Sequence, residues 1–278
     1  MPGKLLPGLH IVATPIGNLG DLSPRAAETL RAAGLILVED TRVTGKLLAH
    51  IGAKARMTRY DDHSSEADRQ MIVDRLGSEV IALVSDAGTP LISDPGYKLV
   101  RAARDAGHSV HAVPGPSAAI AALTLAGLPT DRFLFAGFLP SKAKARSDAI
   151  AEIAAVRATL VFYESGPRLA ETLAALAGHL GERDAAVARE LTKLHEECVT
   201  GTVAELAQRY AKAAVPKGEI VIVVAPPGEA AEPTDEELDA ALDEALATLS
   251  PSRAAADVAE RLKVPRKRAY ARALERAK

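Results

Sequence analysis

Short apolar runs rich in β-branched residues alternate with helical patterns from Leu9 to Val113. Strand-like runs fall near 9–13, 35–38, 55–59, 80–85 and 109–113, and helical patterns near 24–33, 43–51, 65–77 and 95–107. This alternation is typical of a parallel sheet with helices on both faces, because each parallel connection needs a crossover, usually a helix. The sequence therefore predicts an α/β fold whose first sheet is mostly parallel and doubly wound.

Pro114, Gly115 and Pro116 interrupt this pattern, and Ser117 then opens an alanine-rich helix. Proline and glycine at such a point favour a hinge between two domains, with a cleft beside it. Two of the strands expected in the second half follow each other closely enough for an antiparallel pair, so the second sheet is predicted to be mixed. Strands are expected near 133–138, 159–163, 185–190, 196–201 and 219–225, and helices near 142–156, 167–180 and 203–211.

The segment after the Pro-Pro-Gly turn at 226–228 divides into an acidic and a basic part. Residues 229–249 hold eight acids and no bases, whereas residues 250–278 hold nine bases and three acids. Thr234 and Glu237 match a capping box, which indicates the start of a first helix. Two more helices, near 250–262 and from 265 onward, complete an arrangement that resembles a helix-turn-helix.

Length and composition limit the class of protein. The 278 residues are 48% hydrophobic and 25% charged, as in a globular protein. The length suits two α/β domains of ordinary size, and one domain plus a tail is the main alternative. No apolar run approaches the roughly 20 residues that cross a bilayer, and Met1–His10 does not resemble a secretory signal, so we expect a cytosolic protein. The expected parts are an N-terminal α/β domain over 1–113, a C-terminal α/β domain over 114–227 and a basic helical tail over 228–278.

Two loops attract attention because each follows a predicted strand. TPIGNLGD at 14–21 contains neither the GxGxxG of a dinucleotide fold nor a P-loop. SDAGTPLISDPG at 85–96 combines acids, hydroxyls, glycines and prolines at the carboxyl end of a strand, where open α/β sheets bind ligands. It therefore predicts a site for a polar small molecule. We expect no metal, because the one cysteine, Cys198, and the histidine spacing do not match a zinc site.

Six motifs occur in one order along the chain: TPIGNLGD at 14–21, EDTR at 39–42, SDAGTPLISDPG at 85–96, PGPSAA at 114–119, GLPTDRFLFAGFLP at 127–140 and FYES at 162–165. This order resembles the small-subunit ribosomal RNA cytidine 2′-O-methyltransferases. They form one branch of the tetrapyrrole methylase-like superfamily, the class III methyltransferases. The resemblance continues through ARELTK at 188–193 and KGE at 217–219 into the basic tail, and so covers nearly the whole chain.

The resemblance implies that S-adenosylmethionine lies folded in a cleft between the two α/β domains, contacted largely by backbone atoms. It also implies a homodimer and a substrate that is 16S ribosomal RNA, either free or in the 30S subunit. Tetrapyrrole members usually carry a GGDP-like turn where this chain has DAGTP, which favours the RNA branch. Carried over by position, the cofactor residues are Pro15, Ala87, Gly88, Thr89, Ile92, Ser117, Ala118, Tyr163, Glu164 and Leu191.

Methylation of a ribose hydroxyl needs close alignment of donor and acceptor and a group that accepts the hydroxyl proton. The sequence offers four unranked candidates for that group: Glu39, Asp40, His63 and Glu190. For His63, the alternative is an exposed position beside a helix cap. Candidate RNA contacts are Arg42, Lys193, Lys217, Arg266, Lys267 and Arg268.

Alternatives exist for each of these basic groups and for the function. Arg42 could equally form a local ion pair in solvent. Lys193 and Lys217 could simply be exposed lysines, and the charges of the tail could form a solvated face. Aromatic residues make up only 3% of the chain, so stacking of many bases is not expected to dominate RNA binding. The competing functions are a tetrapyrrole C-methyltransferase or a protein-modifying relative, and a non-catalytic RNA-binding assembly factor.

Overall fold

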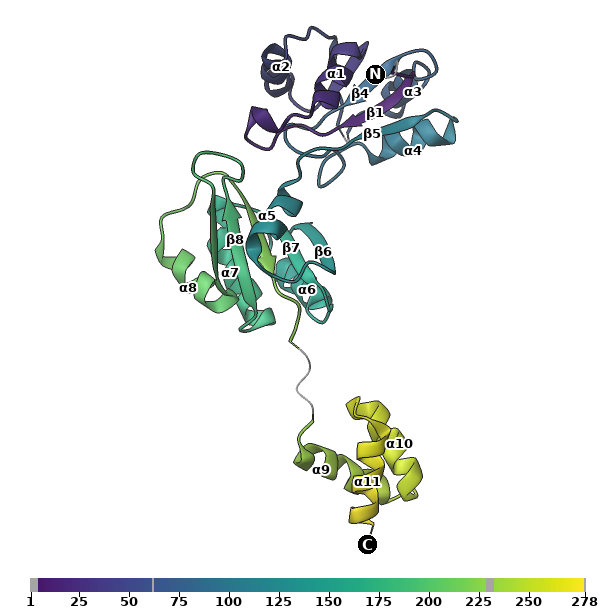
Figure 1. Cartoon of the computed structure of the whole chain (residues 1–278), viewed down its shortest axis with the longest axis vertical. Coiled ribbons are helices and arrows are strands. Elements are labelled where there is room, and N and C mark those ends of the chain that lie inside the picture. The colour runs from purple at the N-terminus through teal and green to yellow at the C-terminus, as the bar shows by residue number, and fades with distance from the viewer. Residues whose placement is uncertain (1–4, 62, 229–232, 278) are drawn as a thin grey trace. The chain divides into compact units, whose positions relative to one another are not determined.

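The computed structural model of the chain describes residues 5–61, 63–228 and 233–277. It divides into two compact units between Pro227 and Gly228, and the first unit holds two five-stranded sheets (Figure 1). The expected boundary at 113–114 between two α/β domains stays a prediction. Four residues of the expected acidic segment, 229–232, and the last basic residue, Lys278, lie outside the described residues.

The first sheet is parallel throughout, in the order β3-β2-β4-β1-β5, as predicted. Helices α1 and α2 pack on one face of the sheet through Leu30 and Leu47, and α3 and α4 pack on the other through Ile72 and Leu99 (Figure 1). The elements are β1 (Gly8–Val12), a 3₁₀ helix (Leu19–Asp21), α1 (Pro24–Ala32), β2 (Leu35–Val38), α2 (Thr41–His50), β3 (Met57–Arg59), α3 (Glu66–Val73), β4 (Val80–Leu83), α4 (Tyr97–Asp105) and β5 (Val110–Val113).

Strands β1 and β4 lie side by side, but their crossovers run in opposite directions. The chain leaves β1 and passes beyond β4 to reach β2, whereas the chain leaving β4 passes beyond β1 to reach β5. The two connecting loops therefore diverge at the carboxyl edge of the sheet and leave a crevice, which is where α/β sheets bind ligands. This position fixes where a site can form in the first unit.

The second sheet is mixed, as predicted, in the order β6-β7-β10-β8-β9. Only β6 and β7 pair in parallel, while β7, β10, β8 and β9 pair antiparallel in turn. Helices α6, α7 and α8 cover one face, and α5 covers the other. The elements are α5 (Ala118–Ala126), β6 (Phe133–Phe138), α6 (Ala143–Ile153), β7 (Thr159–Ser165), α7 (Gly166–Leu180), β8 (Asp184–Arg189), β9 (Glu197–Thr202), α8 (Val203–Lys212) and β10 (Glu219–Val224).

Three helices of the parallel-sheet region have ends at least two residues from the expected ones, and α6, expected over 142–156, ends at Ile153. Helix α2 begins at Thr41 because the Asp40 carboxylate accepts a hydrogen bond from the Arg42 backbone N–H at 2.8 Å. Helix α4 begins only at Tyr97 because Gly96 has a φ of +131°, outside the helical range. Helix α3 ends at Val73, and the residues beyond it form turns closed by i to i+3 bonds.

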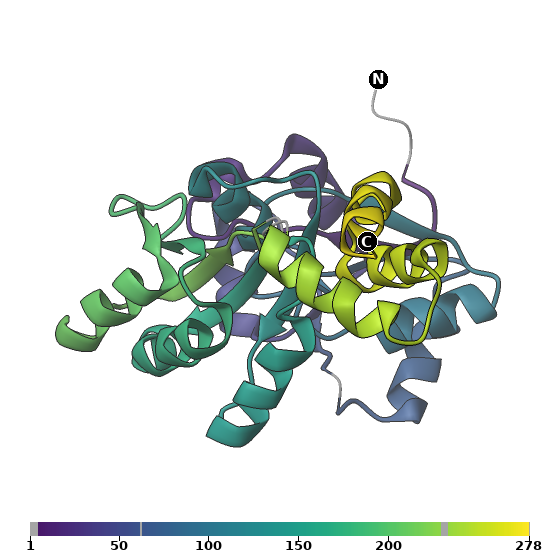
Figure 2. The same cartoon turned by 90° about the horizontal axis from the view of Figure 1, so that it is seen from below.

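The second unit contains α9 (Asp235–Leu246), α10 (Pro251–Leu262) and α11 (Arg266–Arg276) within the part of the chain that is described. The expected capping box is present, since Thr234 and Glu237 each accept the backbone N–H of the other, at 3.2 and 2.9 Å. Figures 1 and 2 show the three helices packed against one another. Their small core is built from Leu238, Leu242 and Val258 with many alanines, which allow the helices to approach closely.

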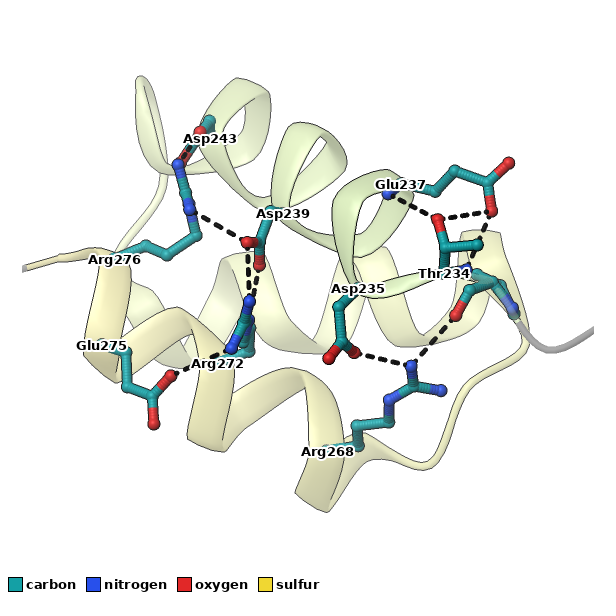
Figure 3. Close-up of polar contacts among 10 residues, drawn as sticks. Thr234, Asp235, Glu237, Asp239, Asp243, Arg268, Arg272, Glu275 and Arg276 are labelled. Atoms are coloured by element: carbon teal, nitrogen blue, oxygen red, sulfur yellow. Dashed lines mark hydrogen bonds and ion pairs between the residues drawn. The ribbon is translucent and has the colours of Figure 1, made fainter.

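A row of ion pairs joins α9 to α11 (Figure 3). On each helix the charged residues recur every four positions, so they lie along one face. The acidic and basic parts of the tail are therefore used, in part, to hold the unit together. The pairs are Arg268 with Asp235 at 2.8 Å, Arg272 with Asp239 at 2.6 Å, Arg276 with Asp239 at 3.0 Å, and Arg276 with Asp243.

Asp239→Asn is expected to lower the melting temperature of the second unit, because Arg272 and Arg276 both lose a charged acceptor. The bond from Arg272 holds the pKa of the Asp239 carboxyl below its usual value. The stabilisation is therefore complete at neutral pH and is lost as the pH falls through this lowered pKa. Thermal unfolding of the full chain by circular dichroism, at neutral pH and in acid, measures it.

Glu236→Gln is the matched control, since Glu236 is exposed on the same helix and forms no ion pair with the described residues. Both variants lose one negative charge from α9. Equal melting temperatures for the two variants at neutral pH would contradict a stabilising role for the ion-pair row.

Candidate functional site

A cavity of about 280 Å³, here called the first cavity, lies at the carboxyl edge of the parallel sheet. Its walls come from the loops after β1 and β4, the start of α5, and the second sheet. Nine of the ten expected cofactor residues line it: Ala87, Gly88, Thr89, Ile92, Ser117, Ala118, Tyr163, Glu164 and Leu191. The tenth, Pro15, lines a neighbouring cavity instead. The role of these residues in cofactor binding stays a prediction.

Hydrogen bonds fasten the two loops that form the floor of the first cavity. Thr14 and Gly88 exchange backbone bonds of 2.8 and 3.1 Å in an isolated bridge, and the Thr14 hydroxyl donates to the Ser85 carbonyl at 3.2 Å. The Thr89 hydroxyl donates to the Pro116 carbonyl at 2.9 Å, which ties the loop to the segment before α5. Gly88 has a φ of +82°, and a Cβ there would lie 3.3 Å from Ile16, so glycine keeps this wall open.

Left-handed backbone conformations at residues other than glycine gather around the same cavity. Leu91 and Ser93 in the loop after β4 have φ values of 74° and 64°, and Glu190 and Thr192 after β8 have 51° and 65°. Such conformations are sparsely populated and persist where the surrounding structure enforces them, often at functional sites. The loops that line the cavity are thus held in shapes that local preference alone does not favour.

The first cavity is strongly acidic. Its lining contains six acids, and Lys193 is the one basic residue among the described residues that line it. Burial, together with the nearby Asp94 and Asp86 carboxylates, raises the pKa of Glu39 to about 7. Burial also raises the pKa of Asp94 to about 6. The buried Oε1 atom of Glu39 has no hydrogen-bond partner among the described residues.

The four candidate proton acceptors are not brought together. Glu39 and Glu190 line the first cavity, and Glu190 forms a 2.9 Å ion pair with Lys193. Asp40 lies outside it, bonded to the exposed guanidinium of Arg42 at 2.5 Å. His63 is exposed, outside the cavity lining, and its backbone N–H donates to Asp61.

The candidate RNA contacts are also separated. Arg42 is in a local ion pair with Asp40, and Arg268 is in the row that joins α9 to α11. Lys193 lines both cavities, whereas the exposed Lys217 lines neither. Arg266 and Lys267, at the start of α11, are exposed and lie outside the ion-pair row.

The second sheet supplies an aromatic wall. Tyr163 on β7 meets Phe135 and Phe138 edge to face, with ring centres 4.8 and 5.6 Å apart. Its hydroxyl accepts the backbone N–H of Ala119 at 3.3 Å, at the start of α5. The Tyr163 ring is therefore fixed against both the sheet and the helix.

Glu164 follows Tyr163 on the same strand, so its side chain lies on the opposite face of the sheet. Its Oε2 accepts the Thr172 hydroxyl at 2.6 Å and lies 3.5 Å from the Arg168 guanidinium, and the side chain is fully buried. Glu164 borders the first cavity, but its carboxylate is held by α7.

Several lining residues were not among the predicted ones. Five of them lie inside the sequence motifs described above, but the motifs alone do not show which of their residues face the cavity: Asp86, Ser93, Asp94, Phe138 and Glu219. Ile220 and Val221 belong to a buried strand and carry no polar signal. The missed residues are Ile16, Asp86, Ser93, Asp94, Phe138, Glu219, Ile220 and Val221.

Cys198 is half-buried, and its thiol lies 3.7 Å from the Leu125 carbonyl. Burial raises the pKa of this thiol, which works against a role as a nucleophile. In the described residues, no cluster of three or more acids, histidines or cysteines is arranged to hold a metal ion, and no helix has the length and apolar character to span a membrane.

The fold and the cavity define a class of enzyme. The family model of tetrapyrrole (corrin/porphyrin) methylases matches residues 8–207. A crystal structure of diphthine synthase has a TM-score of 0.63 at 16% identity, covering 78% of this chain and 89% of its own. A cobalt precorrin-4 methyltransferase has a TM-score of 0.56 at 18% identity, with coverage of 78% and 94%. At these identities the likeness concerns the fold, which is that of the tetrapyrrole methylases.

Closer relatives narrow the class. The ribosomal RNA small subunit methyltransferase I of Erythrobacter litoralis is 58% identical, over 98% of this chain and 96% of its own length. The protein of the same name from Mesorhizobium japonicum is 50% identical, over 98% and 92%. The model of the RsmI C-terminal HTH domain matches residues 232–277. The chain belongs to the ribosomal RNA small subunit methyltransferase I family.

Glu164→Ala is expected to lower the free energy of unfolding by about 3 kcal/mol, because it removes the buried carboxylate that pairs with Arg168 and leaves the Thr172 hydroxyl without its acceptor, while Arg168 keeps its bond to the Leu139 carbonyl. Chemical denaturation of the full chain measures this loss. Glu152→Ala is the control, since Glu152 is exposed on α6 and forms no ion pair with the described residues. A Glu164→Ala variant as stable as the control would show that the buried carboxylate is not needed for folding.

Proposed function

We propose that the protein transfers the methyl group of S-adenosylmethionine to the ribose 2′-hydroxyl of a cytidine in 16S ribosomal RNA, and that it acts as a cytosolic homodimer. The observation that carries the proposal is the convergence of nine expected cofactor residues on one acidic cavity at the crevice between β1 and β4. The names of the relatives support ribosomal RNA as the substrate.

The first cavity fits the cofactor by its chemistry. Its carboxylates suit a ligand that carries a sulfonium and an ammonium group, and the unpartnered Oε1 of Glu39 is one acceptor available to such a ligand or to a substrate. Backbone groups at Ala87, Gly88 and Thr89 can approach a polar ligand closely because Gly88 has no side chain. When bound, the cofactor supplies an electrophilic methyl group on a positively charged sulfur.

Glu39 is the candidate that the geometry favours as acceptor of the hydroxyl proton. Asp40 and Glu190 are engaged by Arg42 and Lys193, whereas one oxygen of Glu39 has no partner. Its pKa of about 7 makes Glu39 a stronger base than an ordinary carboxylate, and a general base works best with a pKa near the working pH.

For RNA docking we propose the exposed side chains at the start of α11, Arg266 and Lys267. Arg268, Arg272 and Arg276 already have carboxylate partners on α9, so contacts with RNA phosphate would have to compete with those ion pairs. The basic part of the tail thus serves two purposes, and its outward residues carry the electrostatic attraction for RNA.

The direct test mixes the protein with radiolabelled S-adenosylmethionine and small ribosomal subunits that lack the modification. Label is expected in 16S ribosomal RNA, at the 2′-oxygen of a cytidine. Cofactor binding measured by calorimetry separates the alternatives: binding without RNA labelling would favour another methyltransferase activity. A chain that binds no cofactor would instead be an assembly factor.

The dependence of kcat/KM on pH tests the role of Glu39. The carboxylate is the reactive form, so kcat/KM should rise with pH and level off above the Glu39 pKa of about 7. Asp94→Asn removes a neighbouring negative charge that raises this pKa, so the rising limb should move to lower pH. Glu39→Gln should lower kcat by about 10²- to 10⁴-fold.

Asp105→Asn, an exposed carboxylate on α4 outside the cavity lining, is the control and should leave the profile unchanged. If Glu39→Gln kept both the rate and the acid limb, another group would have to accept the proton.

A further inference from the structure

A second cavity, of about 500 Å³, adjoins the first. Its walls include the loop after β1, part of α2, the loop after β4 and the start of β10. None of the expected cofactor residues except Pro15 and Ala87 lines it. Five residues border both cavities and form the partition between them: Ile16, Asp86, Ala87, Lys193 and Glu219.

We propose that this second cavity holds the nucleotide that accepts the methyl group, with its ribose directed at the partition. The proposal rests on the proposed function and adds to it the place where RNA enters. Methyl transfer needs the acceptor oxygen about 3 Å from the donor carbon, so the acceptor must occupy a space that adjoins the donor site. A cavity that shares five lining residues with the first one meets this condition.

The lining of the second cavity suits a ribonucleotide. Leu19 and Val43 are large apolar residues that are 44% and 39% exposed, and together they offer an apolar surface for the face of a base. Lys46, one turn further along α2, is exposed and forms no ion pair with the described residues, so its ammonium group can meet a phosphate. The loop after β1 and helix α2 thus offer an apolar surface for the base and a cation for the phosphate.

The partition itself is held in place by contacts on both sides. The Lys193 side chain packs directly over the backbone of Gly17. A Cβ atom at position 17 would lie only 2.6 Å from the Lys193 Cγ atom, so this contact needs glycine. Its ammonium group is anchored by Glu190 at 2.9 Å. On the other side, Asp86 accepts the backbone N–H of Asp40 at 3.1 Å, which links the partition to the start of α2. A ribose between these residues would face a fixed wall.

Charge reversal on α2 tests the proposal in the full-length protein. Lys46→Glu should raise the KM for unmodified small subunits by about fivefold or more and reduce the salt dependence of binding by about one phosphate contact. The affinity for S-adenosylmethionine, measured by calorimetry, should stay unchanged. Lys54→Glu is the matched control, because Lys54 is exposed in the same parallel-sheet region but lines neither cavity.

A second measurement places the RNA directly. A photoreactive benzoylphenylalanine at Val43 should crosslink 16S ribosomal RNA at or beside the methylated nucleotide, whereas the same group at His50, which lines neither cavity, should not. If the unaltered protein methylates subunits but Lys46→Glu behaves like Lys54→Glu and Val43 crosslinks elsewhere, the second cavity is not the acceptor site and the proposed function stands. If the unaltered protein labels no RNA, both proposals fail.

Discussion

The opposite crossovers of β1 and β4 are the constraint on which the rest of the first unit depends. Because the chain leaves these neighbouring strands in opposite directions, their loops diverge and a crevice opens at the carboxyl edge of the sheet. The bridge between Thr14 and Gly88 fixes how far the loops separate, and Thr89 links them to the segment before α5. Both cavities are bounded by these same loops, so the proposed donor and acceptor spaces follow from one topological feature.

The electrostatics of the first cavity oppose stability in the absence of a cation. Burial is the main cause that raises the pKa of Glu39 and of Asp94, and neighbouring carboxylates raise both further: Asp94 and Asp86 act on Glu39, and Glu219 and Asp86 act on Asp94. Strained backbone at Ser93 and Glu190 adds to this unfavourable energy. A chain that keeps both features at one place has an arrangement suited to binding a positively charged ligand rather than to stability alone.

Periodicity and turn residues were enough to predict the strands of both sheets, because these depend on local patterns of apolar residues. The expected cofactor residues came from the resemblance in motif order, and nine of the ten line one cavity. What the sequence could not supply is which motif residues face one another across the fold. Pro15 lines the second cavity, which residues distant in the sequence enclose. The Glu164 carboxylate points away from the first cavity because side chains alternate along the strand. The carboxylate partners of Arg272 and Arg276 lie on another helix, α9.

The arginine and aspartate row of the second unit has a consequence for how this module can be exchanged. Three arginines of α11, Arg268, Arg272 and Arg276, meet carboxylates of α9, so the two helices form a matched set. A chimera that combined this α11 with an α9 lacking carboxylates at the positions of Asp235, Asp239 and Asp243 would leave these arginines without their partners. Recombination should therefore keep α9 and α11 together as one module, whereas Arg266 and Lys267 can change without disturbing the ion pairs between the two helices.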